Sequence, residues 1–136
     1  TENPGEGRVT RSGSFSSDTG TALNLVCEWK AVSKDSSTLS FTLNVYVQSY
    51  SLEIGKRTGN SIYINGKGYN FVSNPVNNTN NNTMSRTQIT TVTVDIPAEA
   101  GNSVSIPVSV DWFYNGTYSG TEIGHVVAET TISFST

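Results

Sequence analysis

The chain has 136 residues, a net charge of −3 and a charged fraction of only 14%, while Ser, Thr and Asn together supply 51 residues. This length fits a single domain and leaves little room for a second one. The acidic balance argues against a nucleic-acid partner, because neutralising phosphates requires a basic patch. No apolar run approaches the length of a membrane helix, and the first residues lack the apolar stretch of a signal peptide. We therefore expect neither a nucleic-acid nor a membrane partner.

Residues 1–7 are predicted to form a flexible N-terminal arm or linker, and residues 8–136 one domain. Apolar and polar residues alternate along most of this domain, clearly so over 39–47, 104–114 and 126–134. A period of two is typical of a strand with one face in a core and the other in water. We expect about eight strands and no helix, with the strands at 8–17, 22–33, 38–52, 61–65, 69–73, 86–96, 103–114 and 122–135.

Polar turn residues separate these strands. Asn65-Gly66-Lys67-Gly68 lies between two short apolar runs, and Asn-Gly is the strongest short hairpin signal. Long antiparallel strands joined by polar turns predict an all-β protein, an antiparallel β-sandwich of immunoglobulin-like type. A closed barrel remains an alternative, because alternation does not distinguish one rolled sheet from two packed sheets.

Residues 74–85 are the exception to the alternation. They form an Asn-rich tract that contains few apolar side chains. Such a composition is too polar to bury, so we expect a long exposed loop between strands.

The core is predicted from the aromatic and thiol side chains that lie in phase with their strands. Cys27 is the only cysteine, so no intrachain disulfide and no cysteine-based zinc site can form. Its place in an apolar alternating stretch indicates a buried thiol. The predicted core residues are Cys27, Trp29, Phe41, Trp112 and Tyr114.

Catalytic chemistry has little support in the sequence. His125 is the only imidazole, acidic residues are scattered, and no phosphate-binding glycine loop or metal-binding cluster is visible. We predict no catalytic residues, no metal site, no cofactor and no enzymatic activity. A small hydrolase using Glu28, Asp111 or His125 is the least favoured alternative.

Four tyrosines are candidates for contact with a glycan or a protein partner. Tyr46 is out of phase with its apolar neighbours, and Tyr50 and Tyr63 are also expected to be exposed. Tyr118 lies in a segment flanked by glycines. An exposed Tyr ring can stack on the apolar face of a sugar or pack in a protein interface, since it joins a flat apolar body to a polar tip. A planar row of such rings would favour sugar binding, and isolated rings would favour a scaffold.

One segment resembles a known family. Residues 108–124 read Val-Ser-Val-Asp-Trp-Phe-Tyr-Asn-Gly-Thr-Tyr-Ser-Gly-Thr-Glu-Ile-Gly. This run is similar to a recurring segment in minor structural and tail-associated proteins of siphophages that infect Gram-positive bacteria. The alternating strand that ends at Trp29 and the 64–71 hairpin extend the resemblance over most of residues 8–134. The chain departs from the family pattern in the 74–85 tract and at Glu122 and His125.

The resemblance implies a setting more than a mechanism. It implies an Ig-like module in the tail or on the capsid of a phage virion, which aids assembly or weak attachment to the host. The expected partners are other virion proteins or copies of the chain itself, and a host cell-wall glycan is a further candidate. A carbohydrate-binding module using Tyr46, Tyr50, Tyr63 or Tyr118 is the main alternative.

Overall fold

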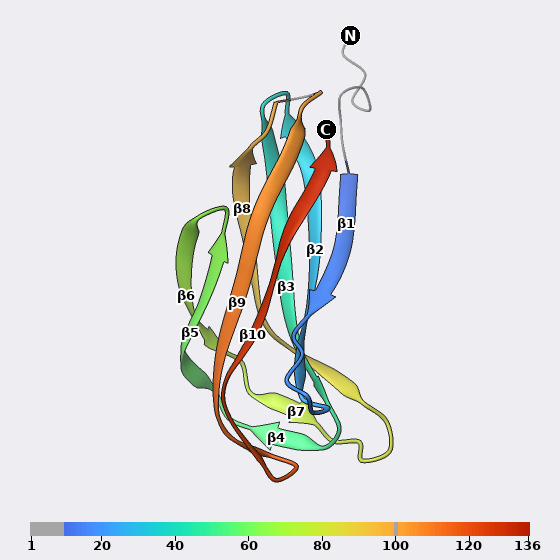
Figure 1. Ribbon diagram of the computed structural model, residues 1–136, viewed down its shortest axis with the longest axis vertical. Coiled ribbons are helices and arrows are strands. Elements are labelled where there is room, and N and C mark those ends of the chain that lie inside the picture. The colour runs from blue at the N-terminus through green and yellow to red at the C-terminus, as the bar shows by residue number, and fades with distance from the viewer. Residues whose placement is uncertain (1–9, 100) are drawn as a thin grey trace.

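The computed structural model describes residues 10–99 and 101–136 (Figure 1). The predicted arm at 1–7 therefore lies outside the described residues. Every regular element in the described part is a strand, and no helix there could cross a membrane. The strands are β1 (Thr10–Ser16), β2 (Asn24–Asp35), β3 (Thr38–Ser49), β4 (Leu52–Ile54), β5 (Arg57–Ile64), β6 (Lys67–Ser73), β7 (Val76–Asn78), β8 (Ser85–Pro97), β9 (Ser103–Tyr118) and β10 (Thr121–Ser135).

Two four-stranded antiparallel sheets pack face to face. One sheet has the order β1-β2-β3-β8 and is called the β3 sheet; the other has the order β10-β9-β5-β6 and is called the β9 sheet. Figure 1 shows the β9 sheet in front of the β3 sheet. Each sheet keeps two edge strands, so the prediction of an all-β antiparallel sandwich is confirmed and the closed barrel is not what forms.

The strand order is not that of a constant-type immunoglobulin domain. There the second and third strands belong to different sheets. Here β2 and β3 form a hairpin within one sheet, with Ala31 opposite Phe41. The chain crosses between the sheets after β3, after β6 and after β8. The short strands β4 and β7 pair with each other at the end of the molecule where the first two of these crossings run (Figure 1).

The core lies between the two sheets and is built from the inward positions of each alternation. Cys27, Phe41, Trp112 and Tyr114 are buried, as predicted. Trp29 is only partly buried; its ring stacks between Phe41 and Phe134, with centroid distances of 6.0 and 5.9 Å. Burial raises the pKa of the Cys27 thiol to about 12, so this side chain is an inert core group and not a nucleophile.

Two-residue turns close both hairpins of the β9 sheet. Asn65 and Gly66 have φ values of 54° and 85°, and Ser119 and Gly120 have values of 51° and 81°. Two consecutive positive φ angles are the signature of the hairpin turn that matches strand twist. The predicted Asn-Gly hairpin is thus confirmed. The last turn is shorter than expected, because β9 continues through Asn115 to Tyr118.

The prediction of one exposed loop over 74–85 is wrong at its first part. Val76 and Asn78 are buried within β7, while residues 79–84 are exposed. The Asn78 amide donates to the carbonyl of Val47 and to Ser49 Oγ, and its oxygen accepts from Thr87 Oγ1 at 2.7 Å. A buried amide is tolerated when its donors and acceptor are all paired, and composition alone did not reveal these partners.

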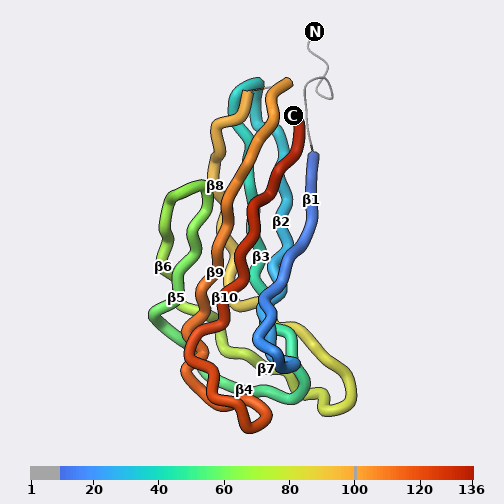
Figure 2. The backbone as a smooth tube through the Cα atoms, in the orientation of Figure 1, coloured from blue at the N-terminus to red at the C-terminus, as the bar shows by residue number. Residues whose placement is uncertain are grey.

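The two ends of the described chain lie side by side. Figure 2 follows β10 to the C-terminus beside the start of β1. The Arg11 guanidinium there donates to the carbonyl of Ser135 at 3.3 Å. The β1 and β10 edges of the two sheets therefore meet along one side of the sandwich.

Candidate functional site

The two outer faces of the sandwich differ in how their polar side chains are used. On the β3 sheet, Arg86 donates to Gln48 at 2.8 Å and to Glu28 at 3.1 Å. Asn44 accepts from Gln88 and from Thr91 in the same face. Polar groups on this face thus bond one another across the strands, which leaves fewer of them free for a ligand.

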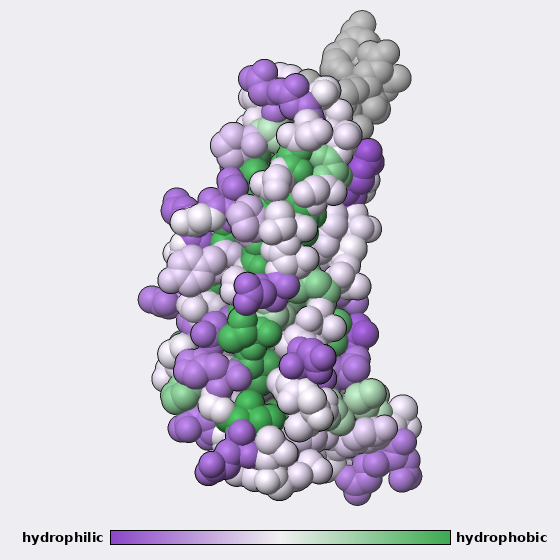
Figure 3. All heavy atoms as spheres, in the orientation of Figure 1, coloured by the Kyte–Doolittle hydropathy of each residue, from purple (hydrophilic) through white to green (hydrophobic). Residues whose placement is uncertain are grey.

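The outer face of the β9 sheet is more apolar and contains most of the exposed large hydrophobic side chains. Tyr63, Val72 and Val127 are 54%, 54% and 41% exposed, and each points away from the core. Phe113 lies among them and is half-buried. Figure 3, which views this face, shows apolar side chains gathered between polar ones over its lower half. Apolar and aromatic surface of this kind is typical of a contact region.

His125 and Asp111 meet on this same face. The His125 Nδ1 lies 2.5 Å from Asp111 Oδ1, and the imidazole also lies against the Phe113 ring with a centroid distance of 4.7 Å. The His125 and Asp111 side chains are 52% and 37% exposed. Both residues belong to the hydrolase alternative predicted from the sequence, and the register of β9 and β10 brings them together.

The His125–Asp111 pair lacks the arrangement of a nucleophilic triad. A triad needs the imidazole between the hydroxyl and the carboxylate. Here Ser61 is the cross-strand partner of Asp111 on the side away from β10, so the carboxylate stands between the serine and the imidazole. Among the described residues, Asp111 is the only hydrogen-bond partner of the His125 ring. Glu28, the other residue of the hydrolase alternative, lies on the opposite face of the sandwich.

The four candidate tyrosines do not form a platform. Tyr46 lies on the outer face of the β3 sheet, opposite Gln88, and Tyr63 on that of the β9 sheet. Tyr50 follows β3 and is 40% exposed. Tyr118 is only 8% exposed, and its Oη accepts a hydrogen bond from the Tyr50 N–H at 3.2 Å. The prediction that Tyr118 offers a contact ring is therefore wrong, because its strand continues further than expected and turns the ring inward.

A groove of about 370 Å³ lies beside Tyr63 on the outer face of the β9 sheet. Its lining combines the Tyr63 ring, Pro107 and Thr131 with the polar side chains of Ser109 and Glu129. Ser109 is the cross-strand partner of both Tyr63 and Glu129, so these three residues form one row across three strands. Tyr63 is a candidate contact residue in the sequence, but its neighbours are not, since no local signal reports which strands pair.

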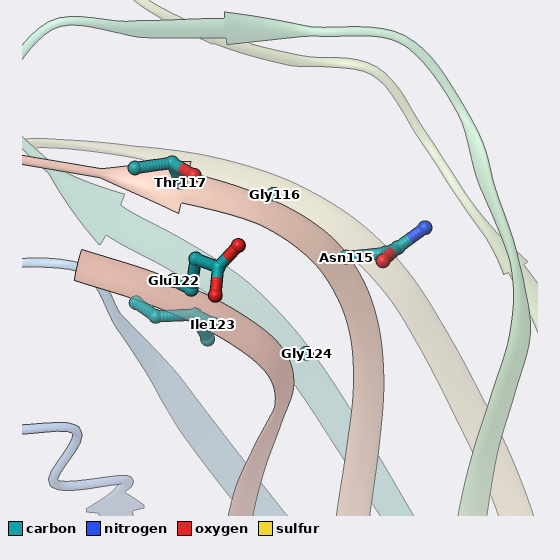
Figure 4. A pocket seen from close by; sticks show the side chains of 6 residues that line it. All are labelled: Asn115, Gly116, Thr117, Glu122, Ile123 and Gly124. Carbon is teal, nitrogen blue, oxygen red and sulfur yellow. The ribbon is translucent and has the colours of Figure 1, made fainter. Parts of the chain in front are cut away.

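A second, more polar pocket of about 330 Å³ lies at the β9–β10 hairpin (Figure 4). Its lining residues are Asn115, Gly116, Thr117, Glu122, Ile123 and Gly124. Thr117 and Glu122 face each other across the hairpin, and the Asn115 side chain points away from them in Figure 4. Only one carboxylate enters this pocket, and the described residues contain no cluster of three or more metal-ligating side chains. The pocket therefore shows no arrangement for holding a metal ion.

Comparison with known proteins returned no match among family models, curated proteins or solved structures.

Proposed function

We propose that this chain is a non-enzymatic β-sandwich module of a phage virion, tail-associated or decorating the capsid, that acts in assembly or in weak attachment to the host surface. The virion setting is supported by the resemblance of residues 108–124 to siphophage proteins. This segment forms most of β9, the turn and the start of β10. We also propose that the sandwich is immunoglobulin-like, with a strand order that differs from that of a constant-type domain.

A single observation supports a contact role most directly. The outer face of the β9 sheet exposes Tyr63, Val72 and Val127, whereas the polar groups of the opposite face bond one another. Exposed apolar side chains cost solubility, so their presence on this face favours a surface that meets a partner. The expected partners are other virion proteins, a further copy of the chain or a host cell-wall glycan.

Sedimentation with particles and cells tests this proposal. The purified chain is mixed with siphophage particles, or with intact Gram-positive cells, and its mass in solution is measured on the same sample. We expect the chain to co-sediment with at least one of them or to self-associate. We expect Val127→Asp to weaken whichever interaction is observed. Thr93→Asp, on the outer face of the β3 sheet, is the matched control and is expected to leave retention unchanged.

Two results would contradict the proposal. One is a monomeric chain that is retained by neither particles nor cells. The other is retention that Val127→Asp and Thr93→Asp reduce equally, because the contact would then not depend on the outer face of the β9 sheet. Hydrolysis of cell-wall material that Asp111→Ala abolishes would replace a contact role by an enzymatic one.

The carbohydrate-binding alternative no longer rests on a row of tyrosines. The rings of Tyr46 and Tyr63 lie on opposite faces, and Tyr118 is buried. One observation still favours it, namely the groove at Tyr63.

A further inference from the structure

We propose that the groove at Tyr63 is a binding subsite for one neutral hexopyranose, with Tyr63 as the stacking ring and Glu129 and Ser109 as the hydrogen-bonding groups. This inference deepens the carbohydrate-binding alternative and does not depend on the virion setting.

The Tyr63 ring is held flat against the neighbouring strand. A β-carbon placed on Gly68 would lie 2.8 Å from Tyr63 Cε2 and 3.3 Å from both Cδ2 and Cζ. Three such similar distances place the ring face over Gly68, because an approach in the ring plane would leave the flanking carbons clearly farther away. Gly68 is the cross-strand partner of Tyr63 and makes room for the ring by having no side chain. One ring face therefore rests on β6 while the side chain stays 54% exposed.

An aromatic ring fixed in this way suits a sugar. The C–H face of a pyranose packs on the open face of an aromatic ring, which gains dispersion and hydrophobic energy without immobilising a mobile side chain on binding. Pro107 adds apolar surface at the groove. The row geometry also fits the size of one ring: Glu129 is two strands from Tyr63, roughly 10 Å, and only the small Ser109 stands between them.

The polar groups of the groove are free to bind. Glu129 is exposed, and among the described residues neither Glu129 nor Ser109 has a side-chain hydrogen bond or an ion pair. A carboxylate accepts from two adjacent hydroxyls, and the serine hydroxyl can donate or accept. This differs from the β3 sheet, where Glu28 is already engaged by Arg86.

Charge selects a neutral sugar over an acidic one. Glu129 brings a negative charge to the groove, no lysine or arginine lines it, and the chain as a whole has a net charge of −3. A uronic acid or another anionic saccharide would meet like charge at the position where the neutral sugar presents hydroxyls. The groove volume of about 370 Å³ lies at the lower end of the range for ligand pockets, which favours one residue of a glycan rather than a chain.

Titration of the whole chain by two-dimensional amide NMR tests the inference, with methyl β-D-galactopyranoside, methyl β-D-glucopyranoside and D-glucuronate as probes. We expect saturable shifts around Tyr63, Ser109 and Glu129 for at least one neutral glycoside, with a Kd on the order of 1 mM, and weaker binding of glucuronate. Absence of saturable shifts for both neutral probes would overturn the inference, as would shifts centred on Tyr46 instead.

Variants separate the parts of the subsite. Tyr63→Ala is expected to weaken binding about tenfold while Tyr63→Phe preserves it, since the ring and not the hydroxyl does the stacking. Gly68→Ala substitutes none of the proposed ligand-contacting residues but displaces the Tyr63 ring, so it should also weaken binding. Gly124→Ala, where an added β-carbon meets nothing within 4 Å, is its control. Equal effects of the two alanine substitutions would contradict the role of the ring.

Glu129→Gln tests the charge. We expect it to weaken binding of the neutral glycoside several-fold and to improve that of glucuronate, because the like charge is removed. Unchanged preference between the two probes would overturn the assignment of Glu129. Retention on phage particles is a separate measurement, and its failure would leave the subsite untouched; failure of the titration would likewise leave the proposed virion role standing.

Discussion

Asn78 is the most deeply buried polar side chain of the tract that composition marks as exposed. Its surroundings supply a partner for each of its hydrogen-bonding groups, at 2.7 to 3.3 Å. The amide therefore ties β7 to β3 and β8, and a residue type that is usually found at surfaces here anchors the crossing between the sheets.

We expect Asn78→Ala to lower the free energy of unfolding by about 2 kcal/mol, since Ser49, Thr87 and the Val47 carbonyl lose a buried partner. Urea denaturation measures this loss. Asn77→Ala is the matched control, because the Asn77 side chain is exposed, and it should change the stability by less than about 0.5 kcal/mol. Equal losses in both variants would show that the buried amide contributes no more than an exposed one.

Cys27 is expected to make the protein sensitive to alkaline pH. Burial raises its pKa from 9.0 to about 12, so the folded chain keeps the thiol proton while the unfolded chain releases it. The contribution of the protonated Cys27 thiol to the free energy of unfolding is complete below pH 9.0. It is lost as the pH rises towards 12, by at most about 1.4 kcal/mol per pH unit.

Cys27→Ala removes this titration. Denaturant unfolding of both proteins at several pH values above 9 is the measurement, and the difference between them cancels the lysine and tyrosine titrations that they share. We expect the gap in stability between the wild-type protein and the variant to shrink as the pH rises. A gap that stays constant would mean that the thiol does not titrate differently in the two states.

At the scale of elements, the two hairpins of the β9 sheet depend on left-handed backbone at their turns. Gly120 has a φ of 81°, and a β-carbon there would meet no atom within 4 Å. A side chain added at Gly120 would therefore lower the stability through its backbone conformation and not through a steric clash with neighbouring atoms.

Gly120→Ala is expected to destabilise the protein by about 1 kcal/mol, because an L side chain disfavours this region. Thermal unfolding monitored by circular dichroism detects the change. Gly55→Ala is the control, since Gly55 is equally uncrowded but does not have a left-handed φ, and its effect should be close to zero or stabilising. A similar loss in both variants would argue against a backbone origin.

At the scale of the whole molecule, the two sheets share one core and should unfold together. Trp112 reports on the β9 sheet, because it is the only tryptophan of that sheet. Trp29 lies on β2, and its ring also stacks on Phe134 of β10, so it reports on the contact between the two sheets. The Trp112 indole is fully buried, and its Nε1 donates to Ser73 Oγ on the same sheet at 3.1 Å.

Single-tryptophan variants turn this into a measurement. Trp29→Phe leaves the probe of the β9 sheet, and Trp112→Phe leaves the probe of the contact between the sheets. Each variant is expected to be less stable than the wild-type protein, and in each the fluorescence and circular-dichroism transitions should coincide in denaturant. A fluorescence transition that precedes the circular-dichroism transition in either variant would indicate that one sheet can unfold alone.

The strands and their inward faces could be predicted because alternation is a local property. Along β3 and β9 the alternate positions that are apolar in the sequence are buried in the structure, from Leu39 to Val47 and from Val104 to Tyr114. A pleated strand has two faces by geometry, and one apolar face must be covered whatever its partner is. The all-β class, the Asn65-Gly66 hairpin and the buried Cys27 follow from the same local rules.

Tertiary structure decided everything that depends on which strands become neighbours. The pairing of β3 with β8 and of β5 with β9 joins segments far apart in the chain, and no local signal encodes those choices. It is this pairing that buries Asn78, that places Asp111 between Ser61 and His125, and that aligns Tyr63 with Ser109 and Glu129. The sequence by itself thus determined which side chains face inward, and the packing of distant strands alone decided which outward side chains stand together, because a surface site is assembled across strands and not along them.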